Sequence, residues 1–193
     1  WHSRMCARDM DGPRILTSAV DIPKGTKKID AFADSVREMY FIENPSVKKS
    51  EADKSTVDSY IEQSDITSVW VYYPWKKIAV HVPSLQSFDR LRTARNRDLI
   101  TSQEQLLYRA AAVGIAGLSV GSSAALALVL TGGPRTLKLA DPDTIELLNL
   151  NRLIAGLGDL GSNKAEVCAR KLYELDPFLD IHIGQSGLDE NNA

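Results

Sequence analysis

A glycine-spaced segment in the second half of the chain is the first place where residue types suggest chemistry. Residues 114–121 read Gly-Ile-Ala-Gly-Leu-Ser-Val-Gly and extend a short apolar run. If a strand leads into a helix here, the turn directs backbone N–H groups and the positive end of the helix dipole toward a bound phosphate. We expect Gly114 to permit the tight turn and Gly117 to permit close approach, with Ala116 in the same cradle. A strand–helix corner that needs small residues only for packing explains the same segment.

An acidic residue closes the next expected strand. Asp141 directly follows residues 136–140. In a parallel sheet the carboxyl ends of the strands form the edge where ligands bind, and a carboxylate there can accept hydrogen bonds from both hydroxyls of a ribose. The glycine turn and Asp141 together therefore favour a nucleotide site over a solvated acid at a strand end.

Further polar residues distinguish between classes of nucleotide. Asp143 and Asn149 follow Asp141, and two cations, Arg152 and Lys164, come next. A dinucleotide diphosphate is neutralised largely by backbone N–H groups, whereas attack at the α-phosphorus of a triphosphate builds charge that aimed cations stabilise. Each residue alone would be interpreted as a surface residue, but this order favours a nucleoside triphosphate.

These residues fall in four ordered motifs that resemble the adenylation domain of the E1-like superfamily, which includes ThiF, MoeB and the ubiquitin-activating enzymes. The motifs are Gly114-x-x-Gly117, Asp141-x-Asp143, Asn149-Leu-Asn-Arg152 and Gly161-x-x-Lys164. The resemblance covers about residues 95–193. It implies a Rossmann-like α/β fold and ATP-dependent adenylylation of the C-terminal carboxylate of a ubiquitin-like or sulfur-carrier protein, with release of pyrophosphate.

The resemblance also implies roles for individual residues. Asp141 would hold the ribose, Asp143 and Asn149 would contact the nucleotide, and Arg152 and Lys164 would act on the phosphates. Arg97 resembles the arginine of the family's entry motif, which reaches the phosphates, often from a partner subunit. We therefore expect a homodimer, and a ubiquitin-like protein with a C-terminal glycine as the partner.

The sequence departs from the family pattern at two positions and in its metal site. Ala116 and Ser119 stand where glycine is usual in the phosphate-binding turn. ATP and Mg²⁺ are the expected cofactors, but the family's magnesium-binding aspartate would lie beyond Ala193, so we assign no metal ligand. Because the chain starts at Trp1 rather than Met, we interpret it as a fragment of a longer protein. Residues 117–122, Gly-Leu-Ser-Val-Gly-Ser, resemble a bacterial subgroup of large proteins of this family. We expect the fragment alone to be inactive, because it lacks that aspartate.

Apolar spacing predicts the elements that position these residues. A doubly wound, mostly parallel sheet is indicated over residues 95–193 because strands alternate with helices there. Its strands are expected over residues 111–115, 136–140 and 181–184, and its helices over residues 119–131 and 162–175, the latter with Ser162 as N-cap.

The first half of the chain has a different pattern. Residues 1–94 are expected to form a small α+β region of unknown role. Its predicted elements are a helix over residues 29–41, a second helix beginning near Ser55, and a hairpin formed by residues 68–73 and 78–82.

Composition and charge exclude several classes of protein. The 193 residues are 44% hydrophobic and 25% charged, as in an average globular protein, which excludes a disordered or fibrous chain. A net charge of −2 gives no general nucleic-acid-binding or polybasic membrane surface. Two cysteines, Cys6 and Cys168, form no disulfide framework, so we expect a reducing, cytoplasmic setting and Cys168 in a helix core.

One uncharged stretch permits a membrane interpretation. The 21 residues Ala110–Leu130 are long enough to span a bilayer. Glycine and serine interrupt the stretch, and a strand, a turn and a buried helix explain the same residues, so we expect no membrane association.

Two other functions stay open at this point. A Rossmann-type oxidoreductase with a nicotinamide or flavin cofactor would explain Gly114, Gly117 and Asp141 but would leave Arg152 and Lys164 without a role. A degenerate E1-like scaffold that binds a partner without catalysis would explain the replaced glycines.

Overall fold

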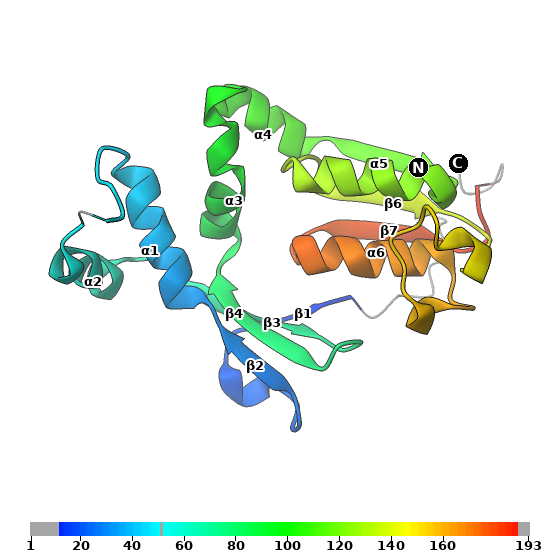
Figure 1. The fold of residues 1–193 in the computed structure, drawn as a ribbon, viewed down its shortest axis with the longest axis horizontal. Helices are drawn as coiled ribbons and strands as arrows, with labels where there is room; N and C mark the ends of the chain where they lie inside the picture. Colours follow the sequence, from blue (N-terminus) through cyan, green and yellow to red (C-terminus); the bar gives the residue numbers. More distant parts are fainter. Residues whose placement is uncertain (1–11, 51, 189–193) are drawn as a thin grey trace. The chain divides into compact units, whose positions relative to one another are not determined.

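Two compact units make up the part of the chain that the computed structural model describes, residues 12–50 and 52–188 (Figure 1). One unit is formed by residues 13–99, and the other by residues 100–188 together with Gly12. The chain therefore passes between the units twice. The second passage, after Leu99, lies five residues beyond the predicted boundary, so Arg97 belongs to the first unit.

A four-stranded sheet organises the unit of residues 13–99. Its strands are β1 (Arg14–Leu16), β2 (Lys27–Asp30), β3 (Ser68–Tyr73) and β4 (Ile78–Pro83), in the order β1-β3-β4-β2. The predicted hairpin is confirmed, because β3 and β4 pair antiparallel across the turn. The two edge strands were not predicted. Here β1 adds antiparallel to β3, and β2 adds parallel to β4.

Three α-helices belong to the same unit: α1 (Phe32–Glu43), α2 (Lys54–Gln63) and α3 (Leu85–Thr93), which continues into the 3₁₀ segment η2 (Ala94–Asp98). A shorter 3₁₀ turn, η1 (Ala19–Asp21), lies between β1 and β2. The helix predicted over residues 29–41 is wrong at its start, since Ile29 lies on β2. The spacing was right beyond that point, because Val36 and Met39 of α1 are fully buried.

A hydrogen-bonded chain of three side chains explains why a strand precedes α1. Asp30 Oδ1 lies 3.0 Å from His81 Nδ1 and also accepts from the Phe32 N–H at the start of α1, while Ser68 Oγ lies 2.8 Å from His81 Nε2. The His81 ring stacks on Trp70, with centroids 4.7 Å apart. This network joins β2, β3, β4 and the first turn of α1.

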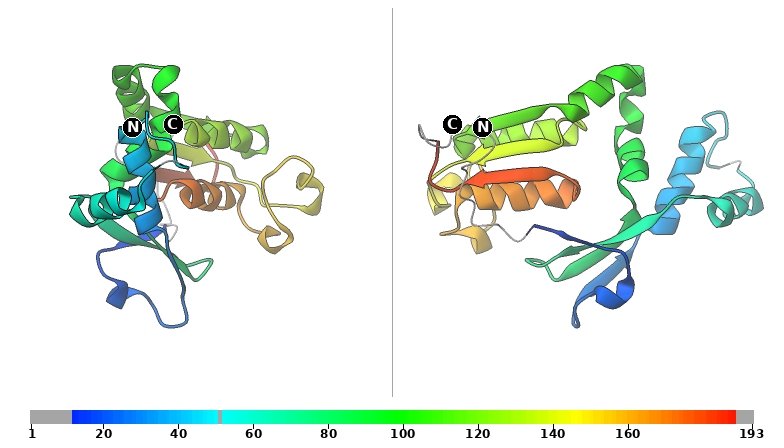
Figure 2. Two further views of the ribbon diagram at one scale, coloured as in Figure 1. Left: turned by 60° about the vertical axis from the view of Figure 1, so that its left-hand side comes forward. Right: turned by 180° about the vertical axis from the view of Figure 1, so that it is seen from behind.

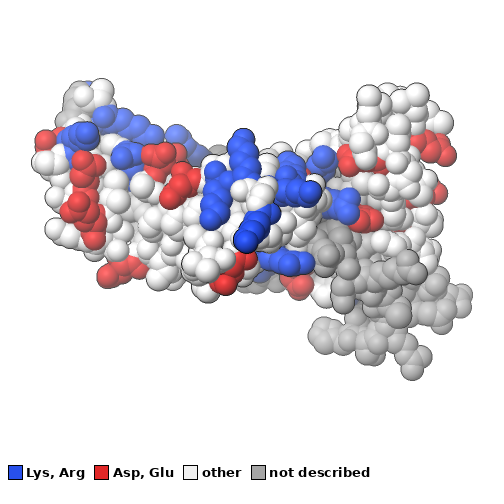
Figure 3. Space-filling model, turned by 90° about the horizontal axis from the view of Figure 1, so that it is seen from below, with Lys and Arg blue, Asp and Glu red and all other residues white. Residues whose placement is uncertain are grey.

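Lysines gather at one end of this sheet. Lys27 N–H donates to Lys77 O at 3.0 Å, which brings the β3–β4 turn beside the start of β2. Five exposed lysines stand on β2 and the two neighbouring turns: Lys24, Lys27, Lys28, Lys76 and Lys77. Figure 3 shows Lys and Arg side chains gathered near the centre of one face.

A parallel three-stranded sheet organises residues 100–188. Helix α4 (Ser102–Ala110) leads into β5 (Ala112–Ala116), α5 (Leu118–Leu130), β6 (Thr136–Ala140), α6 (Lys164–Leu175) and β7 (Asp180–Gly184). The order is β5-β6-β7, and all pairs are parallel. Figures 1 and 2 show α5 and α6 along one face of this sheet. The expected Rossmann-like α/β fold is confirmed, with each predicted element within two residues of its position.

The core of this unit lies between the sheet and its two helices. Leu137 and Leu139 of β6 are fully buried, as are Leu118 of α5 and Ala169 of α6. Cys168 is also buried on α6, as predicted. Outside this core, a buried ion pair of 2.7 Å joins Arg109 of α4 to Asp176 after α6.

The uncharged stretch Ala110–Leu130 is divided between the end of α4, strand β5 and helix α5. Within residues 12–50 and 52–188, no helix combines the length and apolar character that a membrane crossing requires.

Candidate functional site

The turn between β5 and α5 is centred on Gly117. Its φ of +83° lies in the left-handed region that favours glycine, and its N–H donates to Ala140 O at 2.8 Å. A Cβ at Gly117 would meet no atom within 4 Å, so the backbone is open on this side. The expectation that Gly114 makes the turn is wrong, because Gly114 lies within β5 opposite Lys138. Ala116 is the last residue of β5 and directly precedes the turn.

A third glycine of this segment, Gly121, has the packing role that the sequence analysis left open for its small residues. A Cβ at Gly121 would lie 2.6 Å from Ile115 Cγ2. Helix α5 can therefore approach β5 closely only because position 121 has no side chain. This contact fixes where the first turn of α5 stands relative to the end of β5.

Asp141 lies at the carboxyl end of β6 and holds the start of α5. Its side chain is buried, with Oδ2 accepting from Leu118 N–H at 2.6 Å and Oδ1 accepting from Asp143 N–H at 2.9 Å. A carboxylate has about four acceptor positions, so each oxygen keeps capacity for one further donor. Asp141 thus orders the turn and the loop after β6, and can still accept from a ligand hydroxyl.

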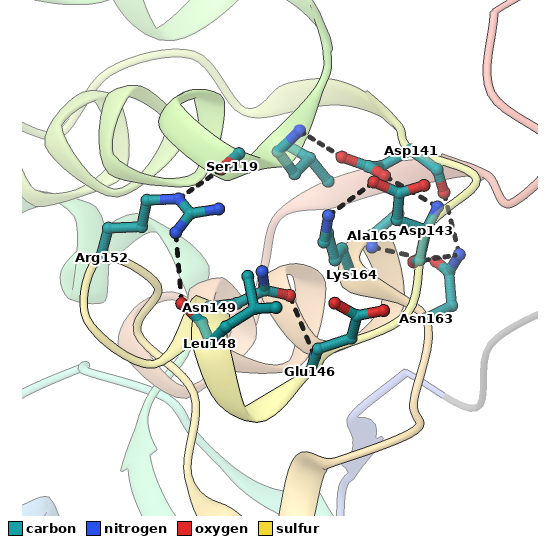
Figure 4. Close-up of polar contacts among 11 residues, drawn as sticks. Ser119, Asp141, Asp143, Glu146, Leu148, Asn149, Arg152, Asn163, Lys164 and Ala165 are labelled. Atoms are coloured by element: carbon teal, nitrogen blue, oxygen red, sulfur yellow. Dashed lines mark hydrogen bonds and ion pairs between the residues drawn. The ribbon is translucent and has the colours of Figure 1, made fainter.

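Lys164 is the first residue of α6 and points to the same place. Its Nζ lies 2.7 Å from Asp143 Oδ2, and the lysine is only 7% exposed (Figure 4). Asn163, rather than the predicted Ser162, caps α6 through Oδ1, while its Nδ2 donates to Asp141 O at 2.8 Å. Asn163 therefore joins the start of α6 to the end of β6. A side-chain oxygen directly before the helix was the only sequence signal for it.

Arg152 reaches the first turn of α5 from the loop between β6 and α6. Its Nε donates to Ser119 Oγ at 2.9 Å, and its guanidinium also donates to Leu148 O (Figure 4). A further hydrogen bond joins the guanidinium to Asn151 Oδ1. Ser119 was interpreted only as a replaced glycine. Its hydroxyl in fact holds the arginine, a role for which the sequence carried no signal.

Asn149 shapes the loop that carries Arg152. Its side chain is 4% exposed, and Oδ1 accepts from Glu146 N–H at 3.0 Å, closing the 3₁₀ turn η3 (Leu147–Asn149). Its backbone carbonyl accepts from Arg152 N–H at 3.1 Å. The predicted contact of Asn149 with the nucleotide stays a prediction.

The structure brings most of the predicted residues to one place. Two cations, two carboxylates and the glycine turn converge on the first turn of α5: Arg152, Lys164, Asp141, Asp143 and Gly117. Arg97 is not among them. It lies on η2 in the other unit, where its guanidinium donates to Ile42 O at 3.4 Å.

The site has features that suit the polyphosphate of a nucleotide. The open left-handed glycine, the N-terminus of the 13-residue helix α5 and two cations suit phosphate oxygens. Among residues 12–50 and 52–188, no group of three or more His, Cys, Asp or Glu side chains comes together to hold a metal.

Comparison with known families assigns the second half of the chain. Residues 93–193, just over half of the sequence, match the model of the ThiF family. The chain belongs to the ThiF family.

Three curated proteins are similar in sequence to part of the chain. The chain is 47% identical over 124 residues to the uncharacterized protein MT1398 of Mycobacterium tuberculosis. It is 33% identical over 103 residues to ubiquitin-like modifier-activating enzyme 5 of Arabidopsis thaliana, and 36% identical over 92 residues to the adenylyltransferase and sulfurtransferase uba4 of Pyricularia oryzae. These matches take in 64%, 53% and 47% of this chain but only 17%, 23% and 19% of the relatives. The chain thus spans less than a quarter of the length of each curated relative.

One solved structure resembles part of this chain. The tRNA N6-threonylcarbamoyladenosine dehydratase TcdA of Escherichia coli, in complex with ATP, is 31% identical with a TM-score of 0.47. The likeness covers 50% of this chain and 40% of that one.

Proposed function

We propose that the unit of residues 100–188 belongs to an ATP-dependent adenylyltransferase. The observation that carries the proposal is how the two cations are held near the open turn at Gly117. Arg152 bonds to Ser119 in the first turn of α5, and Lys164 bonds to Asp143, which Asp141 links to the Leu118 N–H. A Rossmann-type oxidoreductase would explain the glycine turn and the acid at the end of the strand. It would leave Arg152 and Lys164 without a role. Membership of the ThiF family and the relative named an adenylyltransferase support the same choice.

In the proposed reaction a carboxylate oxygen attacks the α-phosphorus of ATP, and the bond from that phosphorus to pyrophosphate breaks. The products are an acyl adenylate and pyrophosphate. The Gly117 and Leu118 N–H groups are already bonded to Ala140 O and to Asp141, so the next N–H groups in the first turn of α5 bind phosphate oxygens. Arg152 and Lys164 stabilise negative charge that grows on the α-phosphate and on the leaving pyrophosphate.

Hydrogen bonds within the chain prepare these groups. Asp143 holds the Lys164 ammonium at 2.7 Å, and Ser119 holds the Arg152 guanidinium at 2.9 Å, so both cations are oriented before substrate arrives. Asp141, already bound to two backbone N–H groups, uses its remaining acceptor positions for the ribose hydroxyls. Mg²⁺ is proposed to accompany ATP, and no step is routed through it.

The proposed acyl substrate is the C-terminal carboxylate of a ubiquitin-like protein ending in glycine, in the cytoplasm. The name of the Arabidopsis relative, a ubiquitin-like modifier-activating enzyme, supports this choice. A homodimer is part of the proposal, because Arg97 resembles the family's entry-motif arginine, which often reaches the phosphates from a partner subunit.

Nucleotide preference tests the proposal. By calorimetry the full-length protein should bind ATP more tightly than NAD. Lys164→Ala should lower ATP–pyrophosphate exchange about 10²–10³-fold and weaken ATP binding much less, because the cation acts mainly on charge that develops in the transition state. Lys171→Ala, on the same helix but paired with Asp159, is the matched control. Tighter binding of NAD than of ATP would contradict the proposal.

Complementation tests the dimer. Arg97→Ala and Lys164→Ala subunits, each inactive alone, should regain part of the exchange activity when mixed, because one hybrid site keeps both residues. If mixed dimers are shown by mass spectrometry and no activity returns, Arg97 does not act across a dimer.

A further inference from the structure

The unit of residues 13–99 contains a pocket that shares only Arg97 with the proposed reaction. It lies between the C-terminal end of α1, the segment that follows this helix, and the end of α3 with η2. Its volume is about 350 Å³. This falls within the range of roughly 300–1,000 Å³ that is typical of small-molecule sites.

One part of the pocket wall is apolar. Phe41 and Ile42 of α1 and Leu91 of α3 line it, and all three are partly exposed rather than sealed in the core. Apolar side chains that stay accessible in a concave surface gain stability when a ligand covers them. This wall therefore fits a ring or a short chain.

The remaining wall carries three cations: Lys49, Arg95 and Arg97. Lys49 Nζ lies 5.6 Å from the centroid of the Phe41 ring, and Arg97 donates to Ile42 O. Over residues 12–50 and 52–188, no carboxylate forms a salt bridge with any of the three. These cations thus keep N–H donors that an anion can use.

Two carboxylates, Glu38 and Asp98, also line the pocket, so its net charge is +1. They oppose the binding of an anion, and the cations favour it. Affinity for an anionic ligand should therefore change in opposite directions when residues of the two kinds are neutralised.

We infer that this pocket binds a small organic anion. Its apolar body lies on Phe41, Ile42 and Leu91, and its anionic head, a carboxylate, sulfonate or phosphate, faces Lys49, Arg95 and Arg97. A partly enclosed apolar wall strengthens the attraction, because field lines from the cations are screened less than on an open surface. The inference does not depend on adenylylation, and its test contains no ATP.

A pair of dyes that differ only in charge tests the inference. 8-Anilinonaphthalene-1-sulfonate carries a sulfonate on the same aromatic body as uncharged N-phenyl-1-naphthylamine. The full-length protein should bind the anionic dye at least about tenfold more tightly, measured by fluorescence titration, since a single ion pair already contributes severalfold and three cations are present.

Variants locate the binding. Lys49→Gln and Arg95→Gln should each weaken binding of the anionic dye about fivefold and leave the uncharged dye unaffected. Glu38→Gln should tighten binding of the anionic dye by a similar factor. Lys24→Gln, which removes an equal charge from the turn before β2, is the matched control and should change nothing. Matching thermal melts exclude dye binding to unfolded protein.

Three outcomes would overturn the inference: equal affinity for both dyes, equal effects of Lys24→Gln and Lys49→Gln, or weaker binding by Glu38→Gln. ATP–pyrophosphate exchange is measured on the same variants except at Arg97. Loss of dye binding with exchange intact separates this pocket from the proposed nucleotide site.

Discussion

Two glycines four residues apart in α5 and its preceding turn are required for different reasons, and a pair of substitutions separates them. Gly121→Ala should destabilise the protein by about 1–3 kcal/mol, because the new Cβ would lie 2.6 Å from Ile115 Cγ2 and push α5 away from β5. Urea unfolding measures the loss. Adding Ile115→Ala removes the obstructing methyl and should restore part of it.

Gly117→Ala is the matched comparison. The new Cβ meets no atom within 4 Å, so its cost is backbone strain alone, about 1–2 kcal/mol. Ile115→Ala should not recover this loss. Recovery in both backgrounds would show that the two glycines share one packing role.

Burial of Cys168 predicts an unreactive thiol. Desolvation raises the pKa of Cys168 from its ordinary value of 9.0 to about 12. In a Cys6→Ser background, iodoacetamide should therefore modify the folded protein at pH 8 about 10³-fold more slowly than the urea-unfolded protein, because only the thiolate reacts. Mass spectrometry measures the rate. Equal rates would place the thiol at the surface.

The raised pKa of Cys168 also determines how the stability of the protein depends on pH. The folded state keeps the Cys168 proton at pH values where the unfolded chain has lost it. The contribution of this thiol to stability is therefore fully present below about pH 9, and is lost as pH rises from about 9 to about 12.

At the scale of elements, strand β2 forms an exposed sheet edge that its own charges protect. All four of its residues are exposed, and two are lysines. Charged side chains on an edge strand discourage pairing with another molecule. Lys27→Val with Lys28→Val should therefore cause concentration-dependent association, measured by light scattering. Lys24→Val, in the turn before the strand, should not; association of both variants would point to general loss of charge.

The edge strand β2 also shows why some strands cannot be predicted from the apolar pattern of the sequence. Strands β5, β6 and β7 follow apolar runs of the right length, so they were predicted closely. Strand β2 reads Lys-Lys-Ile-Asp and has no such pattern. It is a strand because β4 supplies its hydrogen-bond partners and His81 holds Asp30, and both contacts come from residues about 50 positions away.

The candidate site likewise contains residues that the sequence predicted and residues that it did not. Asp141, Arg152 and Lys164 were predicted from their order in the chain, since they follow elements that the pattern locates, and the structure places them near one another. Ser119 and Asn163 were not, because their contacts with Arg152 and with the Asp141 carbonyl depend on how the β6–α6 loop folds back. The turn was placed at Gly114 instead of Gly117 because glycine spacing alone does not show where β5 ends.

For the molecule as a whole, the division into two units predicts independent folding. Residues 13–99 have their own four-stranded sheet and buried residues, including Val36, Met39 and Val71. Expressed alone, this segment should unfold cooperatively with urea, by circular dichroism and by tryptophan fluorescence from Trp70 and Trp75. A segment that lacks a cooperative transition would show that the unit needs the rest of the chain.

The double passage of the chain between the units has a consequence during synthesis. Gly12 lies beside Tyr173 on α6, since a Cβ at Gly12 would be 3.7 Å from the tyrosine ring, whereas Pro13 already belongs to the other unit. A ribosome adds about 5–20 residues per second, so the 161 residues from Gly12 to Tyr173 take roughly 8–32 s. Residues 13–99 emerge complete well before that contact can form. The unit of residues 13–99 can therefore fold before Gly12 and Tyr173 come together. A slow codon run after residue 99 would lengthen that interval without delaying the folding of this unit.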